Sequence, residues 1–185
     1  MESNVLSIVE GHYTVKNGFC KPFLLWYNKY MIIKEASIND IDQVIALINA
    51  SDEEQKDYPG YLERKENADE ILKKEISSRL EDPDYHHFVA KEGEEVIGMI
   101  VANIVNWKTT KADRCGILSN LFVINKLRGN GIADKLVEDA LLWLKENKIY
   151  IVDIYVFPGN VGAQKFWDKL GFSKILDLRS KDLRR

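Results

Sequence analysis

The sequence has few of the residues that mark specialised classes of protein. Two cysteines, three histidines and four prolines occur among 185 residues. Cys20 and Cys115 form no metal-ligand spacing, which leaves two reduced thiols or a single disulfide, and we expect Cys115 to be a small buried hydrophobe. The net charge of -3 provides no general attraction for nucleic acid. We therefore expect neither a metal ion nor a nucleic-acid partner.

Long hydrophobic runs are missing as well. No apolar stretch approaches the ~20 residues that a membrane-spanning helix needs. The run from Phe23 to Tyr27 is interrupted by Asn28 and Lys29, and it lacks the basic segment and the small-residue cleavage site of a signal peptide. These absences predict a cytoplasmic protein with no membrane partner.

Composition and length predict one ordinary globular domain. Apolar residues make up 45% of the chain and charged residues 30%, as is typical of soluble proteins. The first thirty residues show no sustained period of 2 or 3.6, and the pattern becomes regular from Met31 onward. We expect an N-terminal extension over residues 1–30 and one domain over residues 31–185. The alternative is that translation starts at Met31, and the intact mass of natively expressed protein distinguishes the two.

Hydrophobic periodicity predicts strands that alternate with helices. The expected strands are 31–36, 87–90, 96–105, 115–123, 149–157 and 172–176. The expected helices are one that follows Ser37 and carries Ile41 to Ile48, one that follows Asn67, and those at 130–147 and 161–170. Polar connections are expected at 51–65 and 106–113. The order β-α-α-β-β-β-α-β-α-β predicts a mixed α/β domain whose central sheet is covered by helices on both faces.

A glycine-containing turn between a strand and a helix is the most informative segment. The strand ends near Val123, Gly129 and Gly131 follow Arg128, and a helix comes next. The first N–H groups of a helix lack partners and the helix dipole favours negative charge there, so the turn is suited to a pyrophosphate. The alternative is that the glycines are there only because the strand and the helix pack closely. A Rossmann dinucleotide site is excluded, because Asp134 stands where its third glycine would be.

Two motifs here resemble the GNAT superfamily of N-acetyltransferases. The segment from Arg128 to Ala133 is similar to the family signature Gln/Arg-x-x-Gly-x-Gly/Ala. The segment from Asn160 to Phe172 resembles the family pattern Asn-x-x-Ala-x-x-Leu/Phe-Tyr-x-x-x-Gly-Phe. The opening strand and helix are also similar to the family's, so the resemblance covers residues 31–176.

The resemblance implies both a fold and a function. The GNAT acyl-CoA N-acyltransferase fold is a mixed sheet with helices on both faces, in which strands four and five splay apart. The implied reaction transfers an acetyl group from acetyl-CoA to an amine by direct attack, without a metal. The acceptor, a small molecule or a peptide, is not specified, and many relatives form homodimers. Alternatives are a non-catalytic acyl-CoA-binding sensor or scaffold and an enzyme for a different acyl group.

The resemblance also assigns residues to the cofactor. The pantetheine arm would bond to the backbone of strand four, and the pyrophosphate would sit on the amides of the glycine-containing turn. The expected cofactor-binding residues are Leu121, Phe122, Val123, Arg128, Gly129, Asn130, Gly131, Ile132, Ala133, Asp134, Asn160 and Trp167.

Two catalytic groups of the family are replaced in this chain. Trp167 stands where relatives carry a tyrosine that protonates the leaving thiolate, and an indole is not a usable acid. Trp167 would instead pack on the cofactor arm or in the core. Ser119 and Asn120 stand where many relatives have a carboxylate on strand four. Tyr155, on strand five near the splay, is the candidate acid that remains, and a purely structural tyrosine is the alternative.

Other titratable residues are weaker candidates for the missing groups. His86 and His87 begin a strand and alternate faces, so that one of them could reach the cleft. Glu53, Glu54 and Asp57 lie between the first two helices and could attract or activate a cationic amine. The simpler interpretations are a turn histidine, a half-buried histidine and a solvated run of charge.

Overall fold

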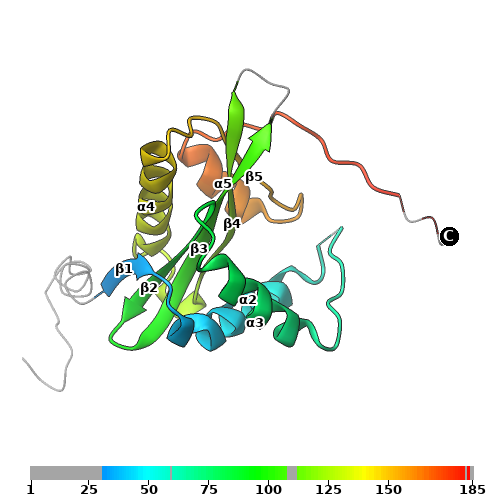
Figure 1. Cartoon of the computed structure of the whole chain (residues 1–185). Helices are drawn as coiled ribbons and strands as arrows, with labels where there is room; N and C mark the ends of the chain where they lie inside the picture. The colour runs from blue at the N-terminus through cyan, green and yellow to red at the C-terminus, as the bar shows by residue number, and fades with distance from the viewer. Residues whose placement is uncertain (1–30, 59, 108–111, 182, 184–185) are drawn as a thin grey trace, which may run out of the picture.

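The structure, a computed structural model, describes residues 31–58, 60–107, 112–181 and 183. The predicted extension over residues 1–30, with Cys20, lies outside the described residues. Figure 1 shows the arrangement of the elements. In chain order they are β1 (Met31–Glu35), the short 3-10 turn η1 (Ile38–Asp40), α2 (Ile41–Gln55), α3 (Ala68–Arg79), β2 (Tyr85–Glu92), β3 (Glu95–Trp107), β4 (Asp113–Val123), the 3-10 turn η2 (Asn125–Leu127), α4 (Ile132–Glu146), β5 (Val152–Ile154) and α5 (Val161–Lys169).

The predicted mixed sheet is confirmed. Its strands follow the order β1-β2-β3-β4-β5, so each strand lies beside its neighbour in the sequence. The first four strands pair antiparallel, and β5 pairs parallel with β4 after the crossover through α4. The helical crossover is what a parallel pair requires.

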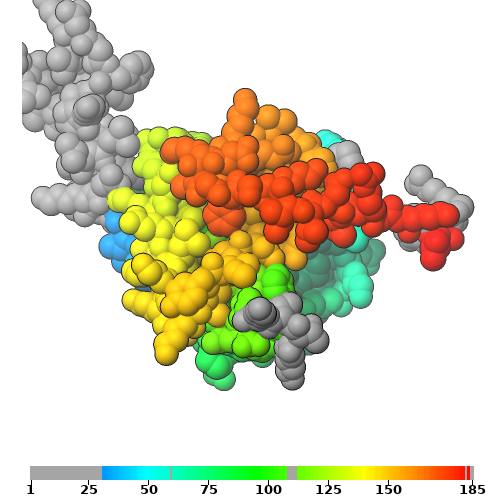
Figure 2. All heavy atoms as spheres, turned by 90° about the horizontal axis from the view of Figure 1, so that it is seen from above, coloured from blue at the N-terminus to red at the C-terminus, as the bar shows by residue number. Residues whose placement is uncertain are grey.

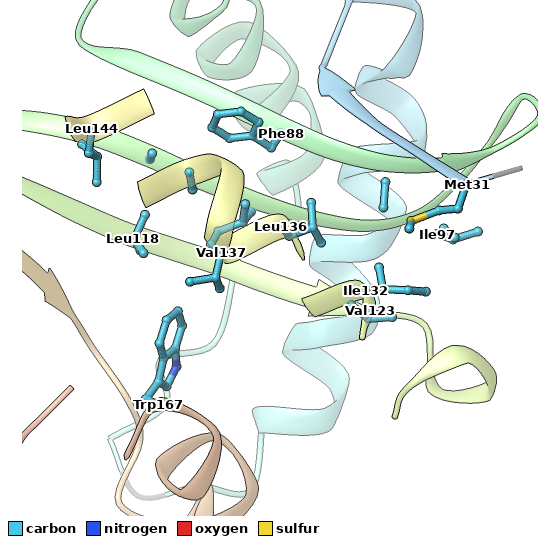
Figure 3. Packing of buried hydrophobic residues seen from close by; sticks show 14 of the residues in the cluster. Met31, Phe88, Ile97, Leu118, Val123, Ile132, Leu136, Val137, Leu144 and Trp167 are labelled. Carbon is cyan, nitrogen blue, oxygen red and sulfur yellow. The ribbon is translucent and has the colours of Figure 1, made fainter. Parts of the chain in front are cut away.

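Helices cover both faces of the sheet, as predicted (Figure 1). On one face the apolar stripe of α4, which includes Leu136, Val137 and Leu144, packs on Phe88 and Leu118 (Figure 3). On the other face, α2 and α3 pack on Val89, Met99 and Phe122 through the buried side chains Ile41, Val44 and Ile76. Each such side chain contributes about 1.5–3 kcal/mol by leaving water. The core therefore fixes β4, which carries the candidate site, from both sides.

One predicted strand is too long, and another does not form. The strand expected at 149–157 and buried on both faces is reduced to β5, and Tyr155 just beyond it is 76% exposed. No strand forms at 172–176, where Ile175 and Leu176 are exposed, and Figure 2 shows the segment after α5 on the outside of the molecule. Among the described residues β5 pairs with β4 alone. The apolar run at 172–176 therefore has no described strand to pair with.

The ends of some helices and strands also differ from the prediction. The helix α2 continues to Gln55, five residues into the segment predicted as a loop, and β3 continues to Trp107. Asn67 precedes α3 as predicted but makes no capping hydrogen bond with its side chain. Within the described part of the chain, no helix is both long and apolar enough to cross a bilayer.

Candidate functional site

The parallel strands β4 and β5 stay paired over a short distance only. Their register runs from Gly116–Val152 to Leu118–Ile154. β4 continues to Val123 and there pairs with β3 alone. The last part of β4 therefore has one edge that no strand of the described chain occupies. This is the parting of strands four and five that the resemblance implies, and it leaves backbone groups for an amide-bearing ligand.

A bulge in β4 lies where the strands part. Met99 of β3 pairs with Phe122, and Val101 pairs with Ser119. Two residues of β4 thus stand opposite one residue of β3, and Asn120 adopts a left-handed φ of 53°. A bulge of this kind bends its strand and increases the local twist. The bulge directly follows the last residues of β4 that pair with β5, where a bend would turn the rest of β4 away from β5.

The turn before α4 exposes unsatisfied backbone N–H groups. Gly129 and Gly131 adopt φ values of 80° and 77°, which only glycine adopts readily. Gly131 is the N-cap and offers no side-chain cap, and the first N–H after it to find a backbone acceptor among the described residues is that of Lys135, bonded to the Gly131 carbonyl at 3.1 Å. Within the described chain, the N–H groups of residues 132–134 are thus available to an anion.

The two glycines are required by backbone conformation and not by close packing. A Cβ atom placed on Gly129 or Gly131 would meet nothing within 4 Å. The interpretation of this turn as a product of close strand–helix packing is therefore wrong. Among the described residues, nothing crowds the positions that these two Cβ atoms would take.

The side chain of Arg128 is bonded to groups of the protein outside the turn. Its Nε donates to the carbonyl of Val123 at 2.8 Å, and its Nη2 donates to both carboxylate oxygens of Glu54 at 3.0 and 2.9 Å. The guanidinium lies 5.0 Å above the ring of Phe122. Its backbone N–H is used by the carbonyl of Asn125 at 3.2 Å. A role of Arg128 in phosphate binding stays a prediction and would require the guanidinium to leave Glu54.

Asn160 and Trp167 have structural contacts in this structure. The Oδ1 atom of Asn160 accepts the backbone N–H of Ala163 at 2.9 Å and so caps α5. Trp167 is 7% exposed and meets the rings of Phe166 and Phe172 edge-on, with centroids 5.2 and 5.0 Å apart. Figure 3 shows its indole beside the α4 core. The core-packing interpretation of Trp167 is thus the one observed.

The acidic residues at the end of α2 are mostly paired. Glu53 forms an ion pair with Lys56, and Glu54 accepts from Arg128 and from Nδ2 of Asn125 at 3.0 Å. Sequence reasoning missed the contact of Glu54 with the turn beyond β4. More than seventy positions separate the partners, and no local pattern relates them.

Cys115 lies in the sheet beside β5 but is not poised as a nucleophile. It is buried, as predicted, and its Sγ lies 3.6 Å from an Oδ atom of Asp153. Burial, and then the adjacent carboxylate, raise the pKa of the Cys115 thiol to about 11. A thiol with that pKa is protonated near neutral pH and reacts poorly. Within the described residues, no cluster of three His, Cys, Asp or Glu side chains is placed to hold a metal ion.

The two histidines lie on β2, which β3 and β4 separate from β5. The His86 ring contacts the rings of Phe88 and Trp143 at a tilt, with centroids 4.2 and 5.2 Å away. His87 is 4% exposed, and neither of its ring nitrogens has a hydrogen-bond partner among the described residues. Neither histidine therefore reaches the parted strands.

The buried His87 predicts acid-sensitive stability. Burial, and then the charges of Arg79 and His86, lower the pKa of His87 to about 4. Between pH ~6.5 and ~4 the unfolded chain binds a proton on His87 that the folded chain does not. The stability that depends on a neutral His87 is therefore fully present above pH 6.5 and is lost as the pH falls. We expect a loss of about 3 kcal/mol across that window. Urea unfolding of wild type and His87→Leu at pH 7 and 4 measures it; an unchanged pH dependence in the variant would contradict the prediction.

Comparison with known proteins identifies the family. The acetyltransferase (GNAT) family matches residues 43–172. An uncharacterized N-acetyltransferase of Archaeoglobus fulgidus is 28% identical over 156 residues, which cover 84% of this chain and 94% of that protein. The matched family segment contains both the unpaired stretch of β4 and the turn before α4.

Solved structures share the fold. A predicted acetyltransferase of Clostridium acetobutylicum, solved with acetyl-CoA, gives a TM-score of 0.71 at 18% identity and covers 83% of this chain and 97% of its own. An aminoglycoside N-acetyltransferase in complex with CoA gives a TM-score of 0.65 at 18% identity, with coverages of 84% and 95%. At these identities the likeness shows the architecture of the domain. With the family match over most of its length, the chain belongs to the acetyltransferase (GNAT) family.

Proposed function

We propose that the chain is an N-acetyltransferase that uses acetyl-CoA as co-substrate and an amine as acceptor. One observation carries the proposal: the unpaired edge of β4 lies beside the open, uncapped start of α4. The edge suits the amides of a pantetheine arm, and the helix start suits a pyrophosphate. Support comes from solved relatives in complex with acetyl-CoA and with CoA.

The transfer would proceed by direct attack of the amine on the thioester carbonyl. The nitrogen–carbon bond forms, the carbon–sulfur bond breaks, the acylated nitrogen gives up a proton to water, and the CoA thiolate leaves and takes up a proton. An alkylamine with a pKa of ~10.4 is almost fully protonated near pH 7, so supplying its neutral form costs ~4 kcal/mol. A backbone N–H on the free edge of β4 would stabilise the oxyanion. The buried, protonated Cys115 argues against an acyl-enzyme on this thiol.

Tyr155 is the proposed acid for the leaving thiolate. It directly follows β5, at the end of the paired part of the two strands, and its side chain is free to solvent. General acid catalysis contributes about 10²–10⁴-fold to a rate. We expect Tyr155→Phe to lower kcat by about 100-fold at unchanged affinity for CoA. Steady-state kinetics with matched CoA titrations measure both, and full turnover by the variant would remove Tyr155 from the mechanism.

A non-catalytic acyl-CoA-binding domain is the second candidate. It is favoured by Ser119 and Asn120, which replace a carboxylate, and by Trp167, which is buried where relatives have an acid. Thiol release from acetyl-CoA across polyamines, amino acids, aminoglycosides and peptide N-termini separates the two functions. CoA binding without release on any acceptor would favour the sensor. Binding itself is read from thermal stability, because a ligand at ~100 times its Kd adds ~2.7 kcal/mol.

The acceptor and the assembly are proposals as well. Solved structures of an aminoglycoside acetyltransferase and of a similar enzyme with a bisubstrate analogue support a small-molecule acceptor, and a peptide amine is the other expected class. A homodimer would cover exposed apolar side chains of the segment after α5, such as Leu176 and Leu178. Light scattering on the full chain measures the mass of the assembly and so tests for the homodimer. The cytoplasmic location stays a prediction from the sequence.

A further inference from the structure

A single carboxylate interrupts the apolar sequence of β5. Asp153 stands between Val152 and Ile154, and aspartate is depleted in strands. It pairs with Ile117 of β4, and one position later β4 and β5 make their last pair and then part. Real proteins break such local preferences mostly at functional or strained sites. Asp153 is therefore worth a functional explanation.

The carboxylate of Asp153 lies on the face of the sheet opposite to α4. Val152 and Ile154, on either side of it, pack against the core under α4, and successive side chains of a strand point to opposite faces. The contact with Cys115 of β4 agrees with this placement: its Sγ donates to Oδ2 of Asp153 at 3.6 Å. Cys115 and Ile117 are two residues apart and share a face of β4.

No positive charge in the described part of the chain forms an ion pair with Asp153. Its hydrogen-bond partner there is the Cys115 thiol, whose single hydrogen can also go to the carbonyl of Gly116 at 3.3 Å. A neutral thiol is a weak donor, and the Asp153 side chain is only half-buried. The carboxylate therefore keeps lone pairs that can accept a proton.

Asp153 also lies close to the positions where β4 lacks a carboxylate. Ser119 comes two residues after Ile117 and before the bulge, so it points to the same face as Asp153. With neighbouring strands ~4.8 Å apart and a rise of ~3.3 Å per residue, the Cα atoms of Asp153 and Ser119 lie roughly 8 Å apart. A carboxylate and one bound water, with hydrogen bonds of ~2.8 Å, cover such a distance.

We propose that Asp153 is the general base of the transfer, acting from β5 in place of the carboxylate that β4 lacks. The inference rests on the proposed acetyl transfer. As the nitrogen–carbon bond forms, the nitrogen gives its proton to a water that Asp153 holds, and Asp153 takes a proton from that water. The carbon–sulfur bond breaks, and Tyr155, two residues later in the chain, protonates the thiolate. Asp153 then releases its proton to solvent and Tyr155 regains one, so the enzyme is unchanged.

The test uses the full chain and compares Asp153→Asn with wild type. CoA release is measured on the best acceptor of the panel of polyamines, amino acids, aminoglycosides and peptide N-termini, which includes spermidine and kanamycin. Loss of a general base should lower kcat by about 100-fold, with the CoA Kd unchanged. Asp168→Asn removes an exposed carboxylate from α5, and as the matched control it should behave like wild type.

Added formate separates a proton acceptor from a structural carboxylate. Asp153→Ala leaves room for a small carboxylate beside Cys115, so formate should restore part of its kcat and leave Asp153→Asn unchanged. Cys115→Ala removes the described hydrogen-bond partner of Asp153 and should keep turnover close to wild type.

The outcomes keep the base and the function apart. Wild-type kcat in Asp153→Asn, or an Asp153→Ala variant that formate does not restore, would overturn the base and leave the proposed function standing. A wild-type chain that acetylates no member of the panel would overturn the proposed function and the base with it.

Discussion

Replacing Gly131 with glutamate should abolish CoA binding while the domain stays folded. Gly131 is the uncapped start of α4, where three free N–H groups and the helix dipole favour an anion. A glutamate there places a carboxylate against the cofactor phosphates. Like charges brought together at an interface cost several kcal/mol, so we expect Kd to rise ~100-fold or more. Isothermal titration with CoA measures the change.

Gly93 supplies a matched control for this substitution. It has a φ of 60° in the turn between β2 and β3, and its Cβ would also meet nothing within 4 Å. Gly93→Glu therefore introduces a similar backbone strain and the same charge away from the site. It should lower thermal stability about as much as Gly131→Glu and leave CoA affinity unchanged. Wild-type affinity in Gly131→Glu would remove this turn from the cofactor site.

Most of the fold was predictable because its elements carry local signals. The apolar spacing of α4 follows from the one face that it buries, and the apolar runs of β2 and β3 follow from burial on both faces. The last strand failed for a physical reason: Ile175 and Leu176 are apolar, but no described strand lies beside them. Strand formation depends on a pairing partner, which composition alone does not reveal.

The site was predictable only in part. The turn at Gly129 and Gly131 is a local feature, and its positive φ values bear out why glycine stands there. The bonds from Arg128 to Glu54, and the contact of Tyr58 with Gly159, join segments that are far apart in the sequence. Long-range pairs of this kind depend on the packing of α2 against the sheet and leave no pattern in either segment.

Removing the positive charge of Lys91 should destabilise the domain severely. Lys91 on β2 and Asp40 at the start of α2 are 5% and 1% exposed, and Nζ lies 2.8 Å from Oδ1. Ser37 donates to Asp40 as well, through its backbone N–H and its hydroxyl at 2.9 and 2.7 Å. Burial alone would raise the pKa of Asp40, but the hydrogen bonds from Lys91 and Ser37 outweigh it and hold that pKa well below its usual range.

We expect Lys91→Met to lower the free energy of unfolding by about 3–5 kcal/mol, because it leaves a buried carboxylate without its main partner. Lys34, 3.6 Å from Asp40, compensates in part. The loss should be largest near pH 7 and shrink below pH ~4, where Asp40 of the variant takes up a proton and the wild type loses the stability that its lowered pKa supplied. Urea unfolding across this range measures both effects.

Two further variants separate the buried pair from its surroundings. Glu94 is the exposed second partner of Lys91, at 3.5 Å, so Glu94→Gln should change stability by less than about 1 kcal/mol.

Asp40→Leu combined with Lys91→Met replaces both charges by apolar groups. The double variant should be less destabilised than Lys91→Met alone, because no buried charge remains unpaired. If the double variant were the less stable of the two, the cost would lie in lost packing and not in the orphaned carboxylate. The junction between α2 and the sheet would then depend on the packing of these side chains.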